Sequence, residues 1–432
     1  MTNAVRASAA WAERLKRAFG TQSIAMQVYA ACFILIFASG NSILHNYVIH
    51  LTTIMLFAQV FDVLDRHDRP AMQTMFLRKR LSPGSAALLL IALYLAFQAT
   101  MAYMPVIAST YSVRYALYAC LTLFAVRPAV LVLCVRLALL YLNLAAVTII
   151  ADSVLTGSRG GGLLGDYQAA GMMMSIACVL NALDYYRERA GGKSLALFLL
   201  TTTALLLTGK RTFTLIALAA IVVLALVARK QKGRSITRLL LAVLVIVLVV
   251  VVSYGTIEPV RNAVGRFALL ASDDDFELMS GRNLLWDAAW DVFLNNPVFG
   301  IGFGSFAEYY GAYMLERGAA YLTHSIYFGM LAETGLVGTL LFCSLFAWGV
   351  SRTLKGVFAL RRLQQYDSQC EYILLVSLCL QGWFLGYGIT GNGIYDANEM
   401  FFYVVALVMM QSVSSLLRQD GTFDSSPEVM HV

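Results

Sequence analysis

Residues 324–348, "HSIYFGMLAETGLVGTLLFCSLFAW", are the stretch that decides the fold class of this chain. About 20 consecutive, mainly apolar residues are enough for a helix to cross the hydrocarbon core of a bilayer. The stretch exceeds that length and contains a single histidine, His324, and a single carboxylate, Glu333. It therefore predicts a membrane-spanning helix with an ionisable side chain at its mouth.

The rest of the chain has the composition of a membrane protein. Of its 432 residues 59% are hydrophobic and only 13% are charged, which is too little charge for the surface of a water-soluble protein. The formal net charge of +7 is explained by lysines and arginines in loops on the cytoplasmic side, so it requires no nucleic-acid partner. We predict an all-α, polytopic protein whose main surroundings are membrane lipids.

Apolar runs predict about twelve spans. They cover residues 24–43, 47–64, 84–104, 112–126, 128–151, 168–185, 194–208, 212–228, 237–254, 324–348, 371–390 and 398–417. The fourth and fifth spans contain Arg114 and Arg136, which leaves the topology between residues 112 and 151 open.

Basic loops orient the chain. Segments such as "DRHDRPAMQTMFLRKR" (65–80) and "SRTLKGVFALRRLQQ" (351–365) fall on the same side as the basic N-terminus. The positive-inside tendency therefore predicts that both termini are cytoplasmic. We expect a cytoplasmic amphipathic segment at 1–23, one transmembrane domain at 24–417, and a cytoplasmic tail at 418–432. A large loop at 255–323, containing short helices, would lie on the opposite, periplasmic side.

Cations interrupt the apolar pattern on that outer side. In "LLLTGKRTFTLIAL" (205–218), Lys210 and Arg211 occupy a turn between two predicted spans. They could be two side chains that extend from a helix end to the membrane surface. They could equally hold an anion there, with Gly209 allowing close approach of a ligand to the backbone.

The large outer loop contains arginine but no lysine, at positions 261, 266, 282 and 317. The planar guanidinium pairs bidentately with phosphate or carboxylate, so its exclusive use suggests recognition of an anion. Ion pairing with the acidic residues of the loop is the alternative, which we favour for Arg261 and Arg317. We assign anion binding to Arg282, at the start of an expected helix over 282–296, and name Arg266 as a further candidate.

Aromatic and glycine residues follow that helix. "NNPVFGIGFGSF" (295–306) could bring bare backbone against a substrate, although it lacks the GK[ST] ending of a phosphate-binding loop. Next, Phe306, Tyr309 or Tyr310, and Tyr313 recur on one helical face. Such a face suits either a membrane interface or a sugar ring, so Tyr310 and Tyr313 are candidate glycan contacts.

His324 returns the chain to the membrane on the same outer face as these cations. It could be an interfacial hydrogen-bonding residue, or it could accept a proton near neutral pH. Glu333 lies too far along the same helix to contact His324, so we expect it to pair with another span. No cluster of Cys, His and carboxylate residues has the spacing of a metal site, which favours a reaction without a metal or other cofactor.

Three segments together resemble one protein family. "LTGKRTFTLIAL", "GRNLLWDAAWDVFLNNPVFGIGFGSF" and "THSIYFGMLAETGLVGTLLF", in this order over residues 205–345, are similar to the O-antigen ligase and polymerase superfamily of bacterial membrane glycosyltransferases. The resemblance implies an inner-membrane enzyme that transfers a glycan from undecaprenyl diphosphate to a sugar hydroxyl at the periplasmic face. Inversion at the anomeric carbon is the expected outcome if the transfer is a single displacement.

The same resemblance implies the roles of particular residues and leaves the acceptor open. Arg211, Arg282 and His324 match the family's catalytic residues, while Lys210 and Arg266 would bind diphosphate or glycan. Where the family often has asparagine after the histidine, this chain has Ser325. We favour a ligase acting on lipid A-core over a polymerase acting on a second carrier-linked glycan. A transporter of lipid-linked glycans is the alternative from a different class.

Overall fold

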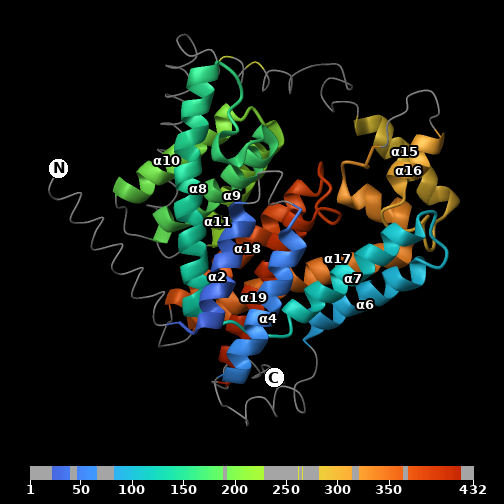
Figure 1. Cartoon of the computed structure of the whole chain (residues 1–432), viewed down its shortest axis with the longest axis horizontal. Coiled ribbons are helices and arrows are strands. Elements are labelled where there is room, and N and C mark those ends of the chain that lie inside the picture. The colour runs from blue at the N-terminus through green and yellow to red at the C-terminus, as the bar shows by residue number, and fades with distance from the viewer. Residues whose placement is uncertain are drawn as a thin grey trace, which may run out of the picture.

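The computed structural model describes most of the predicted transmembrane domain. The described residues are 22–38, 46–65, 82–187, 192–227, 261, 265, 282–313, 321–362 and 368–419. Every regular element within these ranges is a helix, in agreement with the predicted all-α class. Figure 1 shows the helices gathered into one bundle, with α15 and α16 at one end.

The helices are distributed along the whole chain. In order they are α2 (Ile24–Ala38), α4 (Val48–Asp65), α6 (Pro83–Gln98), α7 (Pro105–Leu121), α8 (Pro128–Thr156), the short 3-10 helix η1 (Gly162–Leu164), α9 (Tyr167–Arg187), α10 (Gly192–Leu207), α11 (Arg211–Val227), α15 (Arg282–Asn295), α16 (Phe306–Tyr313), α17 (Ile326–Arg362), α18 (Ser368–Tyr387) and α19 (Ala397–Gln419).

Four of these helices, α8, α17, α18 and residues 397–417 of α19, are long and apolar enough to cross a membrane. Five shorter apolar helices, α2, α4, α6, α10 and α11, accompany them. The chain is therefore an integral membrane protein. The total of twelve spans stays a prediction, and the predicted span at 237–254 lies outside the described residues.

Several predicted boundaries differ from the structure, most clearly those of two helices. The helix predicted at 112–126 is α7, which begins at Pro105 and ends at Leu121. Proline occupies the first turn of α7 and of α8, where its fixed φ suits a helix start and its missing N–H costs nothing. The helix predicted at 324–348 is α17, which continues to Arg362 because its polar last turns extend the helix beyond the apolar run.

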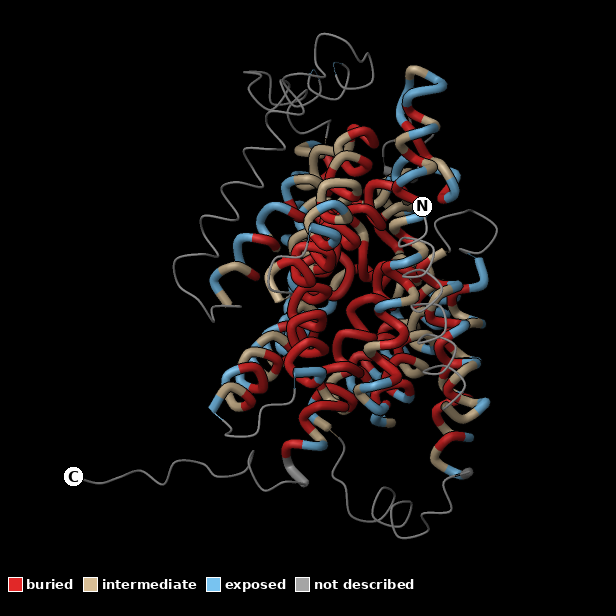
Figure 2. Tube along the Cα trace, turned by 90° about the vertical axis from the view of Figure 1, so that its left-hand side faces the viewer, coloured by how far each residue is buried: buried red, intermediate tan, exposed pale blue. Residues whose placement is uncertain are grey.

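The core lies around α18 and α19, which are the most completely buried of the four long apolar helices. Figure 2 shows the buried residues gathered in the interior of the bundle. Large aromatic side chains fill it, among them Phe33, Trp383, Phe384 and Tyr403. The helices around this centre leave large apolar side chains exposed, such as Leu340 on α17. Such exposure is expected where lipid tails, and not water, surround a helix.

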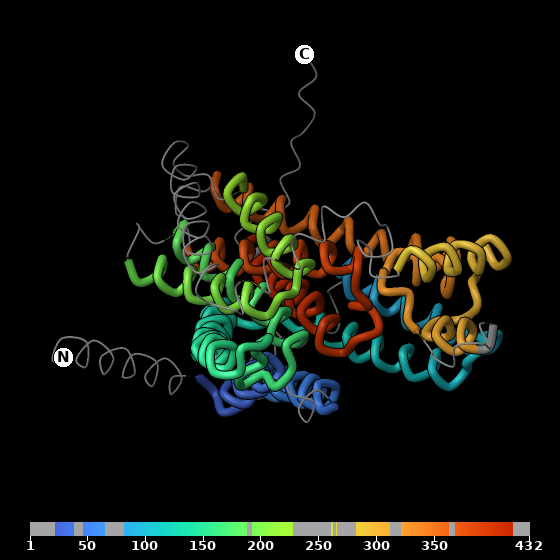
Figure 3. The backbone as a smooth tube through the Cα atoms, turned by 90° about the horizontal axis from the view of Figure 1, so that it is seen from above, coloured from blue at the N-terminus to red at the C-terminus, as the bar shows by residue number. Residues whose placement is uncertain are grey.

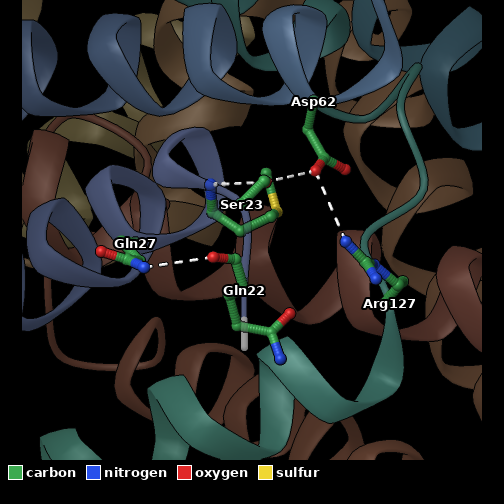
Figure 4. Close-up of polar contacts among 6 residues, drawn as sticks. Gln22, Ser23, Gln27, Asp62 and Arg127 are labelled. Atoms are coloured by element: carbon green, nitrogen blue, oxygen red, sulfur yellow. Dashed lines mark hydrogen bonds and ion pairs between the residues drawn. The ribbon is translucent and has the colours of Figure 1, made fainter. Parts of the chain in front are cut away.

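Polar contacts tie helix ends together at the face opposite the candidate site. Asp62, near the end of α4, accepts a hydrogen bond of 2.6 Å from the Ser23 hydroxyl, which precedes α2. The same carboxylate lies 3.6 Å from the guanidinium of Arg127, which precedes α8 (Figure 4). Arg361 near the end of α17 pairs with Glu371 at the start of α18 at 2.8 Å. The first group joins the ends of α2, α4 and α8, and the second joins α17 to α18, at helix ends that the predicted alternation of spans assigns to one face.

The glycine-rich segment 297–304 packs into a break in α17. Gly335 interrupts that helix with φ 60°, so the neighbouring backbone groups lose their helical partners. The Leu336 N–H donates to the Pro297 carbonyl at 2.9 Å, and the N–H of Gly302 donates to the Glu333 carbonyl at 2.9 Å. A side chain at Gly335 would place its Cβ 2.4 Å from the Val298 backbone. The glycines therefore bring the segment against α17, where the sequence suggested a substrate.

Glu333 completes this junction. Its fully buried carboxylate accepts hydrogen bonds of 2.8 Å from the N–H of Gly304 and from the N–H of Phe306. The second bond satisfies a backbone donor at the start of α16, which an isolated helix would leave unpaired. Glu333 therefore pairs outside its own helix as expected, but its partner is the loop that joins α15 to α16 and not another span.

Candidate functional site

The structure brings Lys210, Arg211, Arg282 and His324 together. Lys210 and Arg211 form the turn into α11, Arg282 begins α15, and His324 lies two residues before α17. Arg282 interacts electrostatically with each of the other three residues. All four side chains are partly exposed, so the cluster is open to a ligand. It joins parts of the chain that are more than 100 residues apart.

Local packing sets the position of Arg282 relative to His324. The Trp286 indole, one turn into α15, donates a 3.1 Å hydrogen bond to the Thr323 carbonyl, next to His324. Its ring also stacks on Phe328 of α17, with centroids 5.2 Å apart. These two contacts hold the first turn of α15 against the start of α17.

His324 has an unusual backbone conformation. Its φ of 50° is the only positive value for a residue other than glycine among the described residues. A non-glycine residue pays a conformational cost in this region, and the surroundings must hold it there. The N–H of Ile326 donates to the Gly388 carbonyl at 2.8 Å, and the buried Ser325 hydroxyl lies 3.5 Å from the same oxygen. Ser325 therefore occupies a packed position at the junction with the end of α18.

The surroundings of His324 favour its neutral form. Burial lowers the pKa of the imidazole below its usual 6.5, and the nearby Arg282 guanidinium lowers this pKa further. An imidazole with a lowered pKa carries no proton on one ring nitrogen at neutral pH. His324 can therefore accept a proton from a bound hydroxyl group.

Asn392, in the loop between α18 and α19, is the polar neighbour of His324 that sequence reasoning missed. Its side-chain amide lies 3.2 Å from Nδ1 of the imidazole. With the amide nitrogen facing Nδ1, the buried Oδ1 of Asn392 has no hydrogen-bond partner in the described part of the chain. Rotating the amide by half a turn would let Oδ1 accept the Nδ1 proton and would leave Nε2 as the free acceptor.

Lys210 faces a second group of residues at the start of α9. Its ammonium nitrogen lies 4.6 Å from the centre of the Tyr167 ring and 3.3 Å from Gln168 Oε1. The guanidinium of Arg159 lies over the same tyrosine ring at 5.1 Å. Burial lowers the pKa of Lys210, and Asp166 opposes that change. Arg159 adds a cation to this side of the cluster that the sequence did not single out.

Tyr387 and Glu399 extend the site on the side of Arg282 that faces the end of α18. The two side chains share a hydrogen bond, and Tyr387 interacts electrostatically with Arg282. The Tyr387 ring also stacks on Phe213 of α11, with centroids 5.1 Å apart. No motif marks either residue, because only the folded chain brings the end of α18 beside Arg282.

The other predicted site residues have different outcomes. Arg266 and the side chain of Tyr313 lie outside the described residues. The Tyr310 ring stacks on Phe306 with centroids 5.6 Å apart and packs against the small core shared by α15, α16 and α17. Its predicted contact with a glycan remains a prediction. Within the described ranges, no three His, Cys, Asp or Glu side chains are grouped as ligands for a metal ion.

Comparison with known families agrees with the resemblance seen in the sequence. The family model described as O-antigen ligase matches residues 196–343. That range contains Lys210, Arg211, Arg282 and His324. Comparison with curated proteins found no match. This match supports membership of the O-antigen ligase and polymerase superfamily.

Proposed function

We propose that this protein transfers a glycan from undecaprenyl diphosphate to a sugar hydroxyl of lipid A-core at the periplasmic face of the bacterial inner membrane. The observation that carries the proposal is the cluster of Lys210, Arg211 and Arg282 beside a histidine of lowered pKa. All four residues belong to the matched O-antigen ligase segment. Three cations suit a diphosphate, and a neutral imidazole suits the removal of a proton from a hydroxyl.

The cations would bind the leaving group. As the sugar–phosphate bond breaks, negative charge grows on the carrier diphosphate. The guanidinium groups of Arg211 and Arg282 can each donate two parallel hydrogen bonds to phosphate oxygens. Lys210 adds a compact charge, and these charges come from separate segments that the fold already holds together. The proposed reaction uses no cofactor or metal.

His324 would act on the acceptor. In a single displacement, the acceptor oxygen forms a bond to the anomeric carbon from the face opposite the diphosphate. The carrier diphosphate leaves with the electron pair of the broken carbon–oxygen bond, and the acceptor proton moves to Nε2 of His324. A displacement of this kind inverts the anomeric configuration. Asn392 would be a positioning residue that keeps the remaining ring proton on Nδ1.

A reconstituted assay tests the proposal and separates it from its alternatives. Purified protein is incubated with carrier-linked glycan, with and without lipid A-core. We expect glycan on lipid A-core and no chain elongation when lipid A-core is omitted. Elongation of the carrier-linked glycan alone would support a polymerase instead. His324→Ala could instead leave glycan transfer unchanged and abolish movement of the lipid-linked glycan across vesicle membranes. That result would favour the transporter hypothesis over the enzyme hypothesis.

A further inference from the structure

A cavity lined by two arginines lies among α8, α9 and α18. It has a volume of about 330 Å³ and is lined by Val132, Arg136, Asp184, Arg187, Ser368, Gln369 and Tyr372. None of these residues belongs to the candidate glycan-transfer site, and the proposed reaction does not use them.

The cavity and the candidate site lie at opposite ends of the same two helices. α9 carries Tyr167, beside Lys210, at its start and Arg187 at its end. α18 carries Tyr387, beside Arg282, at its end and Ser368 at its start. With a rise of 1.5 Å per residue, each helix separates its ends by about 30 Å, which matches the hydrocarbon thickness of a bilayer. The cavity therefore opens at the membrane face opposite the site.

An aromatic ring holds two arginines in this cavity. The guanidinium carbons of Arg136 and Arg187 lie 5.3 Å and 4.9 Å from the centre of the Tyr372 ring. Both distances are within the range of attraction between a cation and an aromatic face. Two like charges are thus kept close together on a shared support, although they repel each other.

Contacts among the described residues engage only part of this donor capacity. Arg136 Nη1 lies 2.9 Å from Asp184 Oδ2, and Arg187 Nη2 donates to the Ser368 carbonyl at 2.6 Å. Each guanidinium offers five N–H donors, and these contacts engage one nitrogen of each. Among the described lining residues Asp184 is the only acidic one, so these residues together carry one positive charge in excess. The ligand that fits is a small anion able to accept several hydrogen bonds.

We propose that this cavity binds a phosphate group through Arg136 and Arg187, with Tyr372 holding the two guanidiniums in place. A phosphate can come from the headgroup of an anionic phospholipid or from free phosphate, and the chemistry of recognition is the same. Basic pockets between membrane helices are suited to lipid headgroups. This site is independent of the proposed glycan transfer, so either one can fail without the other.

Native mass spectrometry of the full-length protein in a neutral detergent tests the proposal. The probes are phosphatidylglycerol, zwitterionic phosphatidylcholine and inorganic phosphate. We expect phosphatidylglycerol to bind more tightly than phosphatidylcholine. Arg187→Gln removes one charge-assisted contact, so it should weaken the affinity for phosphatidylglycerol by about tenfold. The control is Arg362→Gln, which removes an exposed arginine at the neighbouring end of α17, outside the cavity lining.

The outcomes separate the two sources and can overturn the idea. If inorganic phosphate competes with phosphatidylglycerol, free phosphate is a ligand of the cavity. If inorganic phosphate does not compete, the ligand is the lipid headgroup. Equal binding of the two lipids, or unchanged binding in Arg187→Gln, would overturn the proposal. Arg187→Lys guards against misfolding, because it keeps the charge and should retain the preference for the anionic lipid at reduced affinity. The thermal unfolding midpoint of each variant checks its fold.

Discussion

Replacing Glu333 by glutamine tests whether its carboxylate fastens the glycine-rich segment to α17. In the native protein this carboxylate accepts two hydrogen bonds, from the backbone N–H groups of Gly304 and Phe306, each with a nitrogen–oxygen distance of 2.8 Å. Glutamine has nearly the same shape, but only its carbonyl oxygen can accept a hydrogen bond. Its NH₂ group would then face the second backbone N–H, donor against donor.

The magnitude follows from that count of donors. One buried N–H without an acceptor costs about 2 kcal/mol, so Glu333→Gln should lower the free energy of unfolding by about that amount. Glu333→Ala leaves both donors without this acceptor and should cost about 4 kcal/mol, before any loss of packing. Both values are large against the stability of a typical protein domain.

Reversible unfolding in mixed detergent micelles, followed by tryptophan fluorescence, measures these differences. The matched control is Glu308→Gln, since Glu308 is an exposed carboxylate in the first turn of α16, the helix whose start Glu333 caps. We expect the control to change stability by less than about 0.5 kcal/mol. If Glu333→Gln were as stable as this control, the carboxylate would not be fastening the segment, and the reasoning would be refuted.

Four further predictions concern the site and the kink. Burial and Arg282 lower the pKa of His324, so the rate of glycan transfer should be constant from neutral to mildly basic pH. The rate should decline only below the usual histidine range, where the imidazole gains a proton, and a rate–pH profile measures this. Asn392→Asp places a carboxylate beside Nδ1, so the same profile should shift to higher pH, and an unchanged profile would contradict the assigned contact. Arg282→Lys should reduce kcat/KM by about tenfold or more, because lysine keeps the charge and loses the bidentate fork; steady-state kinetics would show this. Gly335→Ala should lower the unfolding midpoint far more than Gly382→Ala, since a Cβ meets backbone at 2.4 Å at the first position and open space at the second.

The helices and the main cluster could be predicted from the sequence because both depend on local patterns. Apolar runs locate helices, and the bias of basic loops assigns the turn with Lys210 and Arg211 to the same face as Arg282 and His324. Residues on one face of a narrow bundle have few places to lie, so their convergence follows. Hydropathy locates only the apolar part of a helix, so the prediction ended at residue 348 and did not include the polar end of α17 up to Arg362.

The remaining parts of the site depend on tertiary contacts that no local pattern records. Asn392 lies 68 residues after His324, and an asparagine in a glycine-containing loop has many ordinary explanations. The pairing of Tyr387 with Glu399 likewise appears only once α18 and α19 are packed. The three glycines near residue 300 were noticed, but the sequence could not say that their partner is a broken helix of the same chain.

The junction between the 297–304 segment and α17 also limits how the molecule can move. Figure 3 shows α15 and α16 together at the end of the bundle where α6 and α7 lie. There the Tyr103 N–H, in the α6–α7 turn, donates to the Ile301 carbonyl at 2.9 Å. If α15 and α16 moved as a lid about this segment, the backbone hydrogen bonds from the segment to α17 and to the α6–α7 turn would have to break together. The segment is therefore an anchor, and any opening of the site that admits a lipid-linked glycan must use a hinge elsewhere in the chain.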